Sequence, residues 1–220
     1  MTHANSFRAV TRLAALTALS MLLASAGTAF AQTTVAPAPW PQASIEITPK
    51  VGYRWGGQIP ARDTTAVAYT GDLQSNGSWG LAIDIPISRY LAIQLLGDHE
   101  RTSLGQDTLF APPGKHFDLD VNYYHLGLVW QWPSGNVTPF FVSSLGIGDL
   151  RPQAAGFTSS QRFSASIGAG VKVAFSEHVA FLLEGRGFWI DTGSATSDWW
   201  DRGSNGFSQG QVNLGLTFSF

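Results

Sequence analysis

The last ten residues of the chain, 211–220, read QVNLGLTFSF, and their pattern decides the class of fold. Every second position is apolar, and these positions are Val212, Leu214, Leu216, Phe218 and Phe220. Glutamine, asparagine, glycine, threonine and serine take the positions between them. Because successive side chains of a β-strand point to opposite faces, the stretch predicts a strand with one wholly apolar face and one polar or small face.

The same two-residue period recurs along the chain and predicts about eight strands. Clear alternation is found in residues 45–55, 79–87, 91–100, 162–175, 179–189 and 211–220. Residues 117–132 alternate as well, but their apolar parity changes near Tyr123, which predicts a β-bulge there. Residues 137–148 complete the set, with a facing that the pattern leaves open. Each segment is close to the ~9–11 residues of a tilted membrane strand.

The connections between these segments alternate between long and short. Long segments rich in Gly, Asp, Ser and Thr are predicted as loops at 57–76, 101–116, 149–161 and 190–206. Short turns are predicted at 88–89, 133–136 and 176–178. Up-and-down barrels in an outer membrane have short turns at one end and longer loops at the other. The predicted fold is therefore all-β, an eight-stranded antiparallel up-and-down transmembrane barrel.

The composition favours a barrel in a membrane over a soluble one. The 220 residues include 24 Gly, eight Trp and 14 Phe, with 13% charged residues and no cysteine. A soluble lipocalin-like barrel is the competing architecture, with its apolar parity inside and its polar parity outside. Here Gly, Ala and Ser stand among charges of both signs on the polar parity. Such small residues suit a narrow, filled interior better than an open surface.

The first residues have the organisation of a secretory signal peptide. Arg8 and Arg12 precede an apolar run, and Ala29 and Ala31 have the spacing of a cleavage site. We therefore expect a signal peptide over 1–31, a Pro-rich lead-in over 32–42 and the barrel over 43–220. The formal net charge is −2, and removing the signal makes the chain more acidic. This charge excludes a general affinity for nucleic acid.

The polar parity predicts a charged network inside the barrel, formed by Glu46, Lys50, Arg54, Asp84, Asp98, Glu100, Lys172, Glu184 and Arg186. An eight-stranded barrel has an interior just wide enough for side chains to fill it. Buried charges are costly unless they are paired. We therefore expect a lumen plugged by ion pairs, with a narrow small-solute channel as the alternative.

The amino-terminal signal, the alternation and the terminal GLTFSF resemble the OmpA/OmpX-type family of eight-stranded outer-membrane β-barrels. The resemblance implies an outer-membrane location, surrounded by lipid and lipopolysaccharide. It also implies that the terminal strand, from Val212 to Phe220, is read by the barrel-assembly machinery. We expect a monomer with a structural or surface-interaction role.

Catalysis, metal binding and cofactor binding are not predicted. Outer-membrane lipid A deacylases carry a serine two residues after a histidine, but Gly127 follows His125 at that spacing. A lipid A-modifying enzyme is therefore only the third alternative. His99 points away from its acidic neighbours on a strand, so no metal site is expected. Trp199 and Trp200, between acidic residues of the last long loop, are candidate contacts for an extracellular ligand.

Overall fold

The computed structural model describes residues 45–62, 68–105, 117–153, 158–191 and 206–220. The predicted signal peptide, the lead-in up to residue 42 and the pair Trp199–Trp200 lie outside these ranges. The described part of the chain contains no helix that is long and apolar enough to cross a membrane.

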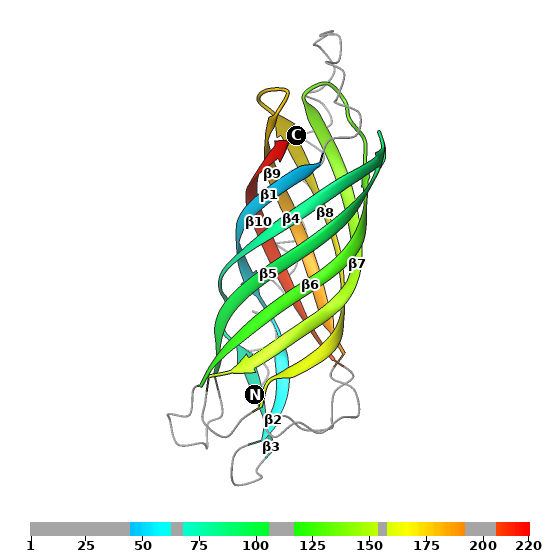
Figure 1. Ribbon diagram of the computed structural model, residues 1–220. Coiled ribbons are helices and arrows are strands. Elements are labelled where there is room, and N and C mark those ends of the chain that lie inside the picture. Colours follow the sequence, from blue (N-terminus) through cyan, green and yellow to red (C-terminus); the bar gives the residue numbers. More distant parts are fainter. Residues whose placement is uncertain (1–44, 63–67, 106–116, 154–157, 192–205) are drawn as a thin grey trace, which may run out of the picture. The chain divides into compact units, whose positions relative to one another are not determined.

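Eight antiparallel strands form a closed ring, as predicted (Figure 1). In ring order they are β1 (Glu46–Trp55), β4 (Asn76–Ser88), β5 (Leu91–Gly105), β6 (Phe117–Gln131), β7 (Val137–Pro152), β8 (Ser160–Ala174), β9 (Val179–Ile190) and β10 (Phe207–Ser219). The last strand closes the ring against the first, with Leu214 opposite Val51. Closure leaves no strand edge exposed to hydrocarbon, where an unpaired edge is not tolerated.

Several strands are longer than the sequence pattern predicted. β5 continues to Gly105 and β7 to Pro152, into stretches that were expected to be loops. The segment 57–76, also expected to be a loop, contains a hairpin of β2 (Gln58–Arg62) and β3 (Ala68–Leu73). β3 continues the barrel wall by pairing with the end of β5. In Figure 1 this hairpin lies at one end of the barrel and the carboxyl terminus at the other.

The bulge predicted near Tyr123 is wrong. β6 pairs with both neighbours without a break at this point, with Tyr123 opposite Asp98 on β5 and Gly148 on β7. Leu119, Val121 and Tyr123 are all buried inside the barrel. The apolar parity changes because the interior itself becomes apolar towards the end with the long connections. The barrel has a register shift elsewhere, between Pro86 and Ser88 beside a short turn.

The outer wall is an apolar band with aromatic residues near the strand ends. The exposed aromatic side chains at these positions are Trp55, Trp79, Tyr90, Trp132, Phe175 and Trp189. Phe207 belongs to the inward parity of β10 and is buried, so it does not join these outer aromatic residues. On β7, whose facing the sequence left open, Phe141, Leu145 and Ile147 point outward.

Inward-facing glycines make room for the side chains of the interior. A Cβ atom on Gly146 would lie 2.7 Å from the Cα of His125 and closer still to the carbonyl oxygen of Tyr124. We expect Gly146→Ala to lower the free energy of unfolding by about 1–3 kcal/mol, because overpacking forces the wall to shift. Urea midpoints of the refolded barrel measure the effect. Gly97→Ala is the control, since nothing lies within 4 Å of a Cβ there; equal midpoints for both variants would contradict the prediction.

Candidate functional site

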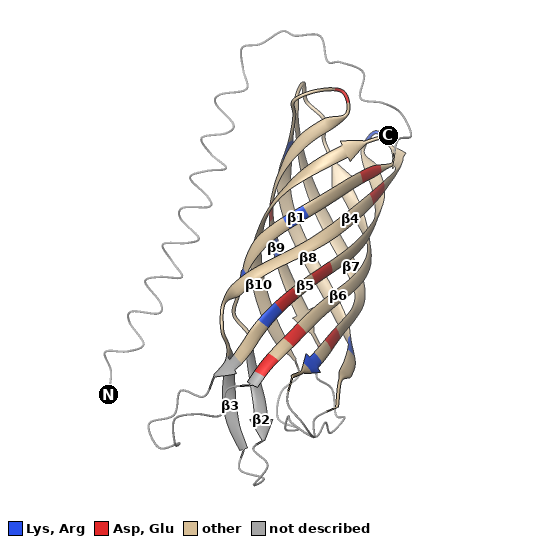
Figure 2. Cartoon of the chain, turned by 60° about the vertical axis from the view of Figure 1, so that its left-hand side comes forward, with Lys and Arg blue, Asp and Glu red and all other residues tan. Residues whose placement is uncertain are grey.

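Charged residues are found at several heights along the strands of the barrel (Figure 2). Those whose side chains are buried in the interior form layers along the barrel axis. In the layer nearest the short turns, the ammonium group of Lys172 lies between two carboxylates, 2.5 Å from Glu46 Oε2 and 3.0 Å from Asp84 Oδ2. The aromatic ring of Phe140 lies 5.8 Å from the same nitrogen. One buried cation is therefore neutralised by acids from two neighbouring strands, β1 and β4.

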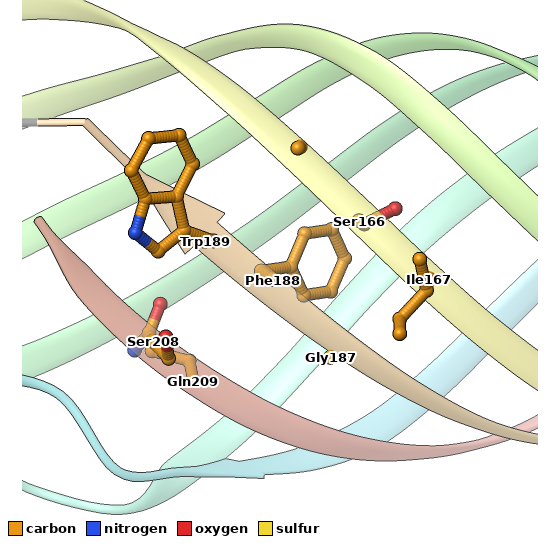
Figure 3. Close-up of a pocket in the computed structure, with 8 residues that line it drawn as sticks. Ser166, Ile167, Gly187, Phe188, Trp189, Ser208 and Gln209 are labelled. Carbon is orange, nitrogen blue, oxygen red and sulfur yellow. The ribbon is translucent and has the colours of Figure 1, made fainter.

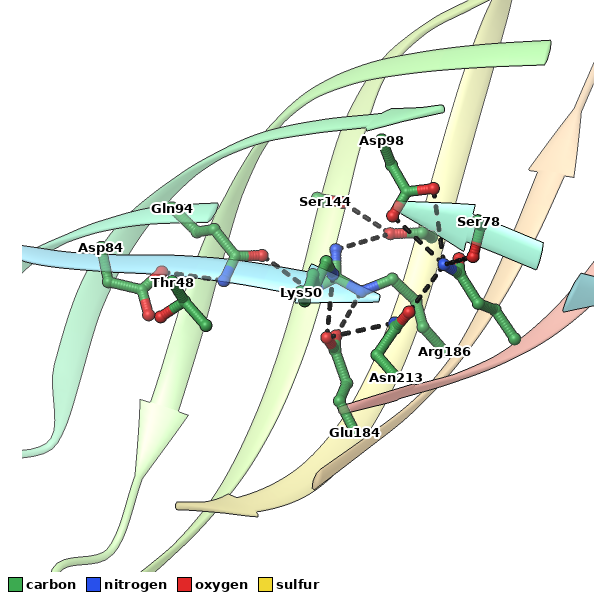
Figure 4. A network of polar contacts seen from close by, with 12 residues as sticks. Thr48, Lys50, Ser78, Asp84, Gln94, Asp98, Ser144, Glu184, Arg186 and Asn213 are labelled. Carbon is green, nitrogen blue, oxygen red and sulfur yellow. Dashed lines mark hydrogen bonds and ion pairs between the residues drawn. The ribbon is translucent and has the colours of Figure 1, made fainter. Parts of the chain in front are cut away.

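The middle layer reverses this stoichiometry, with one carboxylate between two cations (Figure 4). Glu184 on β9 accepts a hydrogen bond of 2.9 Å from Lys50 and a second one from Arg186. Arg186 also donates to the side-chain oxygen of Gln94 at 2.7 Å, and Gln94 in turn donates to Asp84 in the layer below at 2.8 Å. Glu184 thus holds two buried positive charges.

The third layer is built around Arg54, whose side chain is fully buried. Its guanidinium donates to Asp98, to Glu100 at 3.2 Å and to Gln211 at 3.0 Å. It also lies over the rings of Tyr123 and Phe188, at 4.8 Å and 5.0 Å from their centroids. The planar guanidinium is fixed both by hydrogen bonds at its edge and by aromatic rings at its face.

An apolar cluster covers this layer on the side of the long connections. Its members come from six strands of the wall and from the β2–β3 hairpin, and include Leu73, Leu119, Val121, Leu150, Phe188, Ile190 and Phe207. Because these side chains are in contact and buried, they separate the charged layers from solvent at this end. Along β6 the lining of the interior therefore changes to apolar. This change explains the shift in apolar parity from which a bulge was predicted.

All nine residues of the predicted interior network point inward and are buried. The structure brings them together as three groups of three, with an acid-rich layer at each end and a cation-rich layer between them. Gln209 and Gln211, which donate hydrogen bonds to Glu100 and to Asp98, also belong to this network and were not predicted from the sequence. Their position on the inward parity of the terminal strand was a signal that could have found them.

His125 lies beside the third layer and contacts serines that the sequence spacing did not reveal. Its Nδ1 is 2.8 Å from the hydroxyl of Ser144 on β7, and its Nε2 is 3.1 Å from that of Ser164 on β8. Ser164 donates its proton to the carbonyl oxygen of Trp189, so it accepts from Nε2–H. This arrangement matches a neutral imidazole whose two ring nitrogens are both satisfied. In a catalytic triad, one ring nitrogen of the histidine faces the nucleophile and the other is oriented by an acid. Both ring nitrogens of His125 instead contact serine hydroxyls.

Beyond the apolar band, the outer wall of β5 and β6 becomes polar. Outward of Tyr124 on β6, the side chain of Asn122 lies 2.7 Å from His99, and Asp120 accepts a hydrogen bond of 2.8 Å from Arg101. The hydrogen bond from Arg101 lowers the pKa of the Asp120 carboxyl. Among the residues that the structure describes, His, Asp and Glu nowhere form a group of three that could hold a metal ion.

The sequence matches a family model described as "Outer membrane protein beta-barrel domain" over residues 13–220. The chain belongs to the outer-membrane β-barrel family. Its apolar band therefore faces lipid hydrocarbon, and members of this class turn their longer loops to the cell exterior. The predicted resemblance to the OmpA/OmpX-type barrels is confirmed.

Solved structures of outer-membrane barrels share this fold. Neisserial surface protein A (NspA) is 14% identical with a TM-score of 0.54, and the match covers 82% of this chain and 100% of that one. The outer-membrane protein AlkL, determined in lipid bilayers, is 11% identical with a TM-score of 0.55, covering 86% of this chain and 95% of that one. At these identities the likeness concerns the fold alone. No curated protein sequence matches this chain significantly.

Proposed function

We propose that this outer-membrane barrel has a structural or surface-interaction role, with a lumen plugged by its own side chains and no reaction catalysed. The observation that carries the proposal is a set of three hydrogen bonds that cross the interior. They are Lys172–Asp84 at 3.0 Å, Arg186–Gln94 at 2.7 Å and Tyr123–Gln209 at 2.6 Å. Each joins strands four places apart in the ring of eight, which are opposite walls of the barrel.

These bonds obstruct solute passage because two of them belong to the buried charged network. A solute that passes Lys172 or Arg186 must separate a buried cation from its acceptor. Leaving one partner of a buried ion pair uncompensated typically costs about 3–5 kcal/mol. The cost arises at more than one depth, and apolar side chains such as Leu119, Leu150 and Ile190 fill the interior at the end with the long connections. A stable plug is therefore favoured over a narrow small-solute channel.

The proposed interaction surface is the end with the long connections. The barrel wall continues past the membrane band there, with the β2–β3 hairpin and the polar outer faces of β5 and β6. An extracellular ligand would meet this end, and Trp199 and Trp200 remain predicted contacts. We propose a monomer in contact with lipid and lipopolysaccharide, whose terminal strand is recognised by the barrel-assembly machinery.

Planar-bilayer recording on the refolded protein tests the plugged lumen. We expect no steady conductance, whereas a porin added afterwards to the same bilayer provides the positive control. Steady and reproducible conductance steps from the refolded barrel would overturn the plug and support the channel. The lipid A of cells with and without the protein should have the same mass spectrum; a changed acyl pattern that depends on His125 would instead support the enzyme.

A further inference from the structure

The outer wall contains a furrow on the face formed by β8, β9 and β10 (Figure 3). The cavity has a volume of about 340 Å³. Its lining residues on the outward parity are Ala165, Ile167, Gly187, Trp189 and Ser208. The intervening residues of the same strands, Ser166, Phe188 and Gln209, belong to the inward parity and supply the floor. The furrow is thus a feature of the lipid-facing surface and is separate from the lumen.

The furrow is lined on β9 by Gly187, which has no side chain, and the next outward position of this strand, Gly185, is also glycine. A Cβ atom on Gly187 would meet nothing closer than 3.9 Å, and one on Gly185 nothing closer than 4.0 Å. The residue of β10 that is paired with Gly187 is also a glycine, Gly210. By contrast, Gly210 is covered by the indole of Trp55, which lies 2.8 Å from a Cβ atom built there. A strip of bare backbone therefore runs along β9.

Larger side chains border this strip. Ile167 is paired with Gly187 from β8, and Trp55 covers the neighbouring position on the other side. Along β9, Trp189 bounds the strip at the interfacial end, and Leu183 bounds it towards the centre of the apolar band. The bare region is consequently elongated along the strand, one strand wide, and open towards the membrane.

The position of the furrow relates it to the outer leaflet of the membrane. Trp55 and Trp189 lie near the strand ends at the side of the long connections, where aromatic residues mark the interface. Leu183 is paired with Leu214 in the apolar band. The furrow therefore begins at the interface, beside the hydroxyl of Ser208, and continues into hydrocarbon.

We propose that this furrow seats one acyl chain of an outer-leaflet lipid. An elongated apolar strip that starts at a polar edge matches a hydrocarbon chain with an ester group at its upper end. The Ser208 hydroxyl is placed to contact that ester group. In hydrocarbon, association depends on van der Waals packing, since lipid tails are as apolar as the wall. The missing side chains of Gly185 and Gly187 supply such packing by letting the chain approach the backbone.

A second copy of the barrel is a poorer occupant. Stable protein interfaces bury about 1,200–2,000 Å² in total, whereas a cavity of about 340 Å³ has the size of a small-molecule site. Trp55, Ile167 and Trp189 border the glycine strip and would hold a broad partner surface away from it. A narrow and flexible chain passes between these side chains.

Native mass spectrometry of the refolded barrel with dimyristoylphosphatidylglycerol in detergent tests the proposal. We expect the wild type to retain one lipid, and Gly187→Leu to lose it, because the leucine side chain fills the furrow. Gly97→Leu is the matched control, since this outward glycine lies on β5, directly opposite β9 in the ring, and also has nothing within 4 Å of its Cβ position. Heat-modifiable gel mobility verifies that each variant is folded.

Two outcomes would overturn the proposal. Equal lipid retention by the wild type and both variants, or no retention by the wild type, would show that the furrow holds no specific chain. Dimers of the wild type that Gly187→Leu abolishes would show that a second copy occupies it. Neither outcome depends on whether the lumen conducts, because the furrow lies on the outer wall.

Discussion

Replacing Glu184 with alanine is expected to lower the free energy of unfolding of the refolded barrel by about 3–5 kcal/mol, the usual cost of leaving a buried charge without its partner. The effect should lie at the upper end of this range because Glu184 serves two cations. Lys50 is 2.9 Å from its carboxylate, and Arg186 donates to the other oxygen. Both cations would remain in the interior without their shared acid.

The measurement is equilibrium unfolding in urea of the barrel refolded into lipid vesicles. Glu177→Ala is the matched control, because Glu177 lies exposed in the turn between β8 and β9; surface changes of this kind stay within about 0.5 kcal/mol. Adding Lys50→Ala to Glu184→Ala should cost less than the sum of the single changes, since contacting residues are coupled. A urea midpoint of Glu184→Ala that equals the wild type would exclude a stabilising role for this network.

Leu214→Arg is expected to destabilise the barrel by roughly 2–4 kcal/mol, because it places a cation on the lipid face near the middle of the membrane. Leu214 is 46% exposed on the outer wall and is paired with Val51 on one side and Leu183 on the other. Its surroundings are thus apolar on both neighbouring strands. The arginine head group is too far from either interface to reach water without distorting the bilayer.

Ser208→Arg is the control for depth. Ser208 has the same outward parity on the same strand but lies at the interfacial end, where a cation costs only about 0–1 kcal/mol. Heat-modifiable gel mobility and urea midpoints compare the two variants. If Leu214→Arg folded as well as the wild type while Ser208→Arg did not, the assignment of the outer wall to lipid would be inverted.

Much of the fold follows from the sequence because a strand has a strict period of two. The terminal alternation around Leu214 assigns an outward and an inward parity, and the same reasoning applied to Lys50 and Glu184 selected the charges that are found inside. The prediction of a bulge at Tyr123 is wrong for the same reason. A period-two pattern shows that the apolar residues change from one parity to the other. It does not show whether the cause is a bulge in the strand or an interior that becomes apolar.

The sequence by itself determined the eight strands of the barrel wall, the facing of most of them and the closed barrel, because side-chain alternation and the length of a membrane crossing are local properties. Only the tertiary structure decided which side chains meet. Arg186 and Gln94 are 92 positions apart in the chain, and they bond because the tilt and stagger of a closed ring bring them to the same depth on opposite walls. Gly187 and Gly97 both lie on the outward parity of their strands. Gly97 is paired with Leu81 and Tyr124, whereas Gly187 is paired with Ile167 on one side and with another glycine, Gly210, on the other. That lateral placement is set by ring closure, and it turns a missing side chain into a furrow.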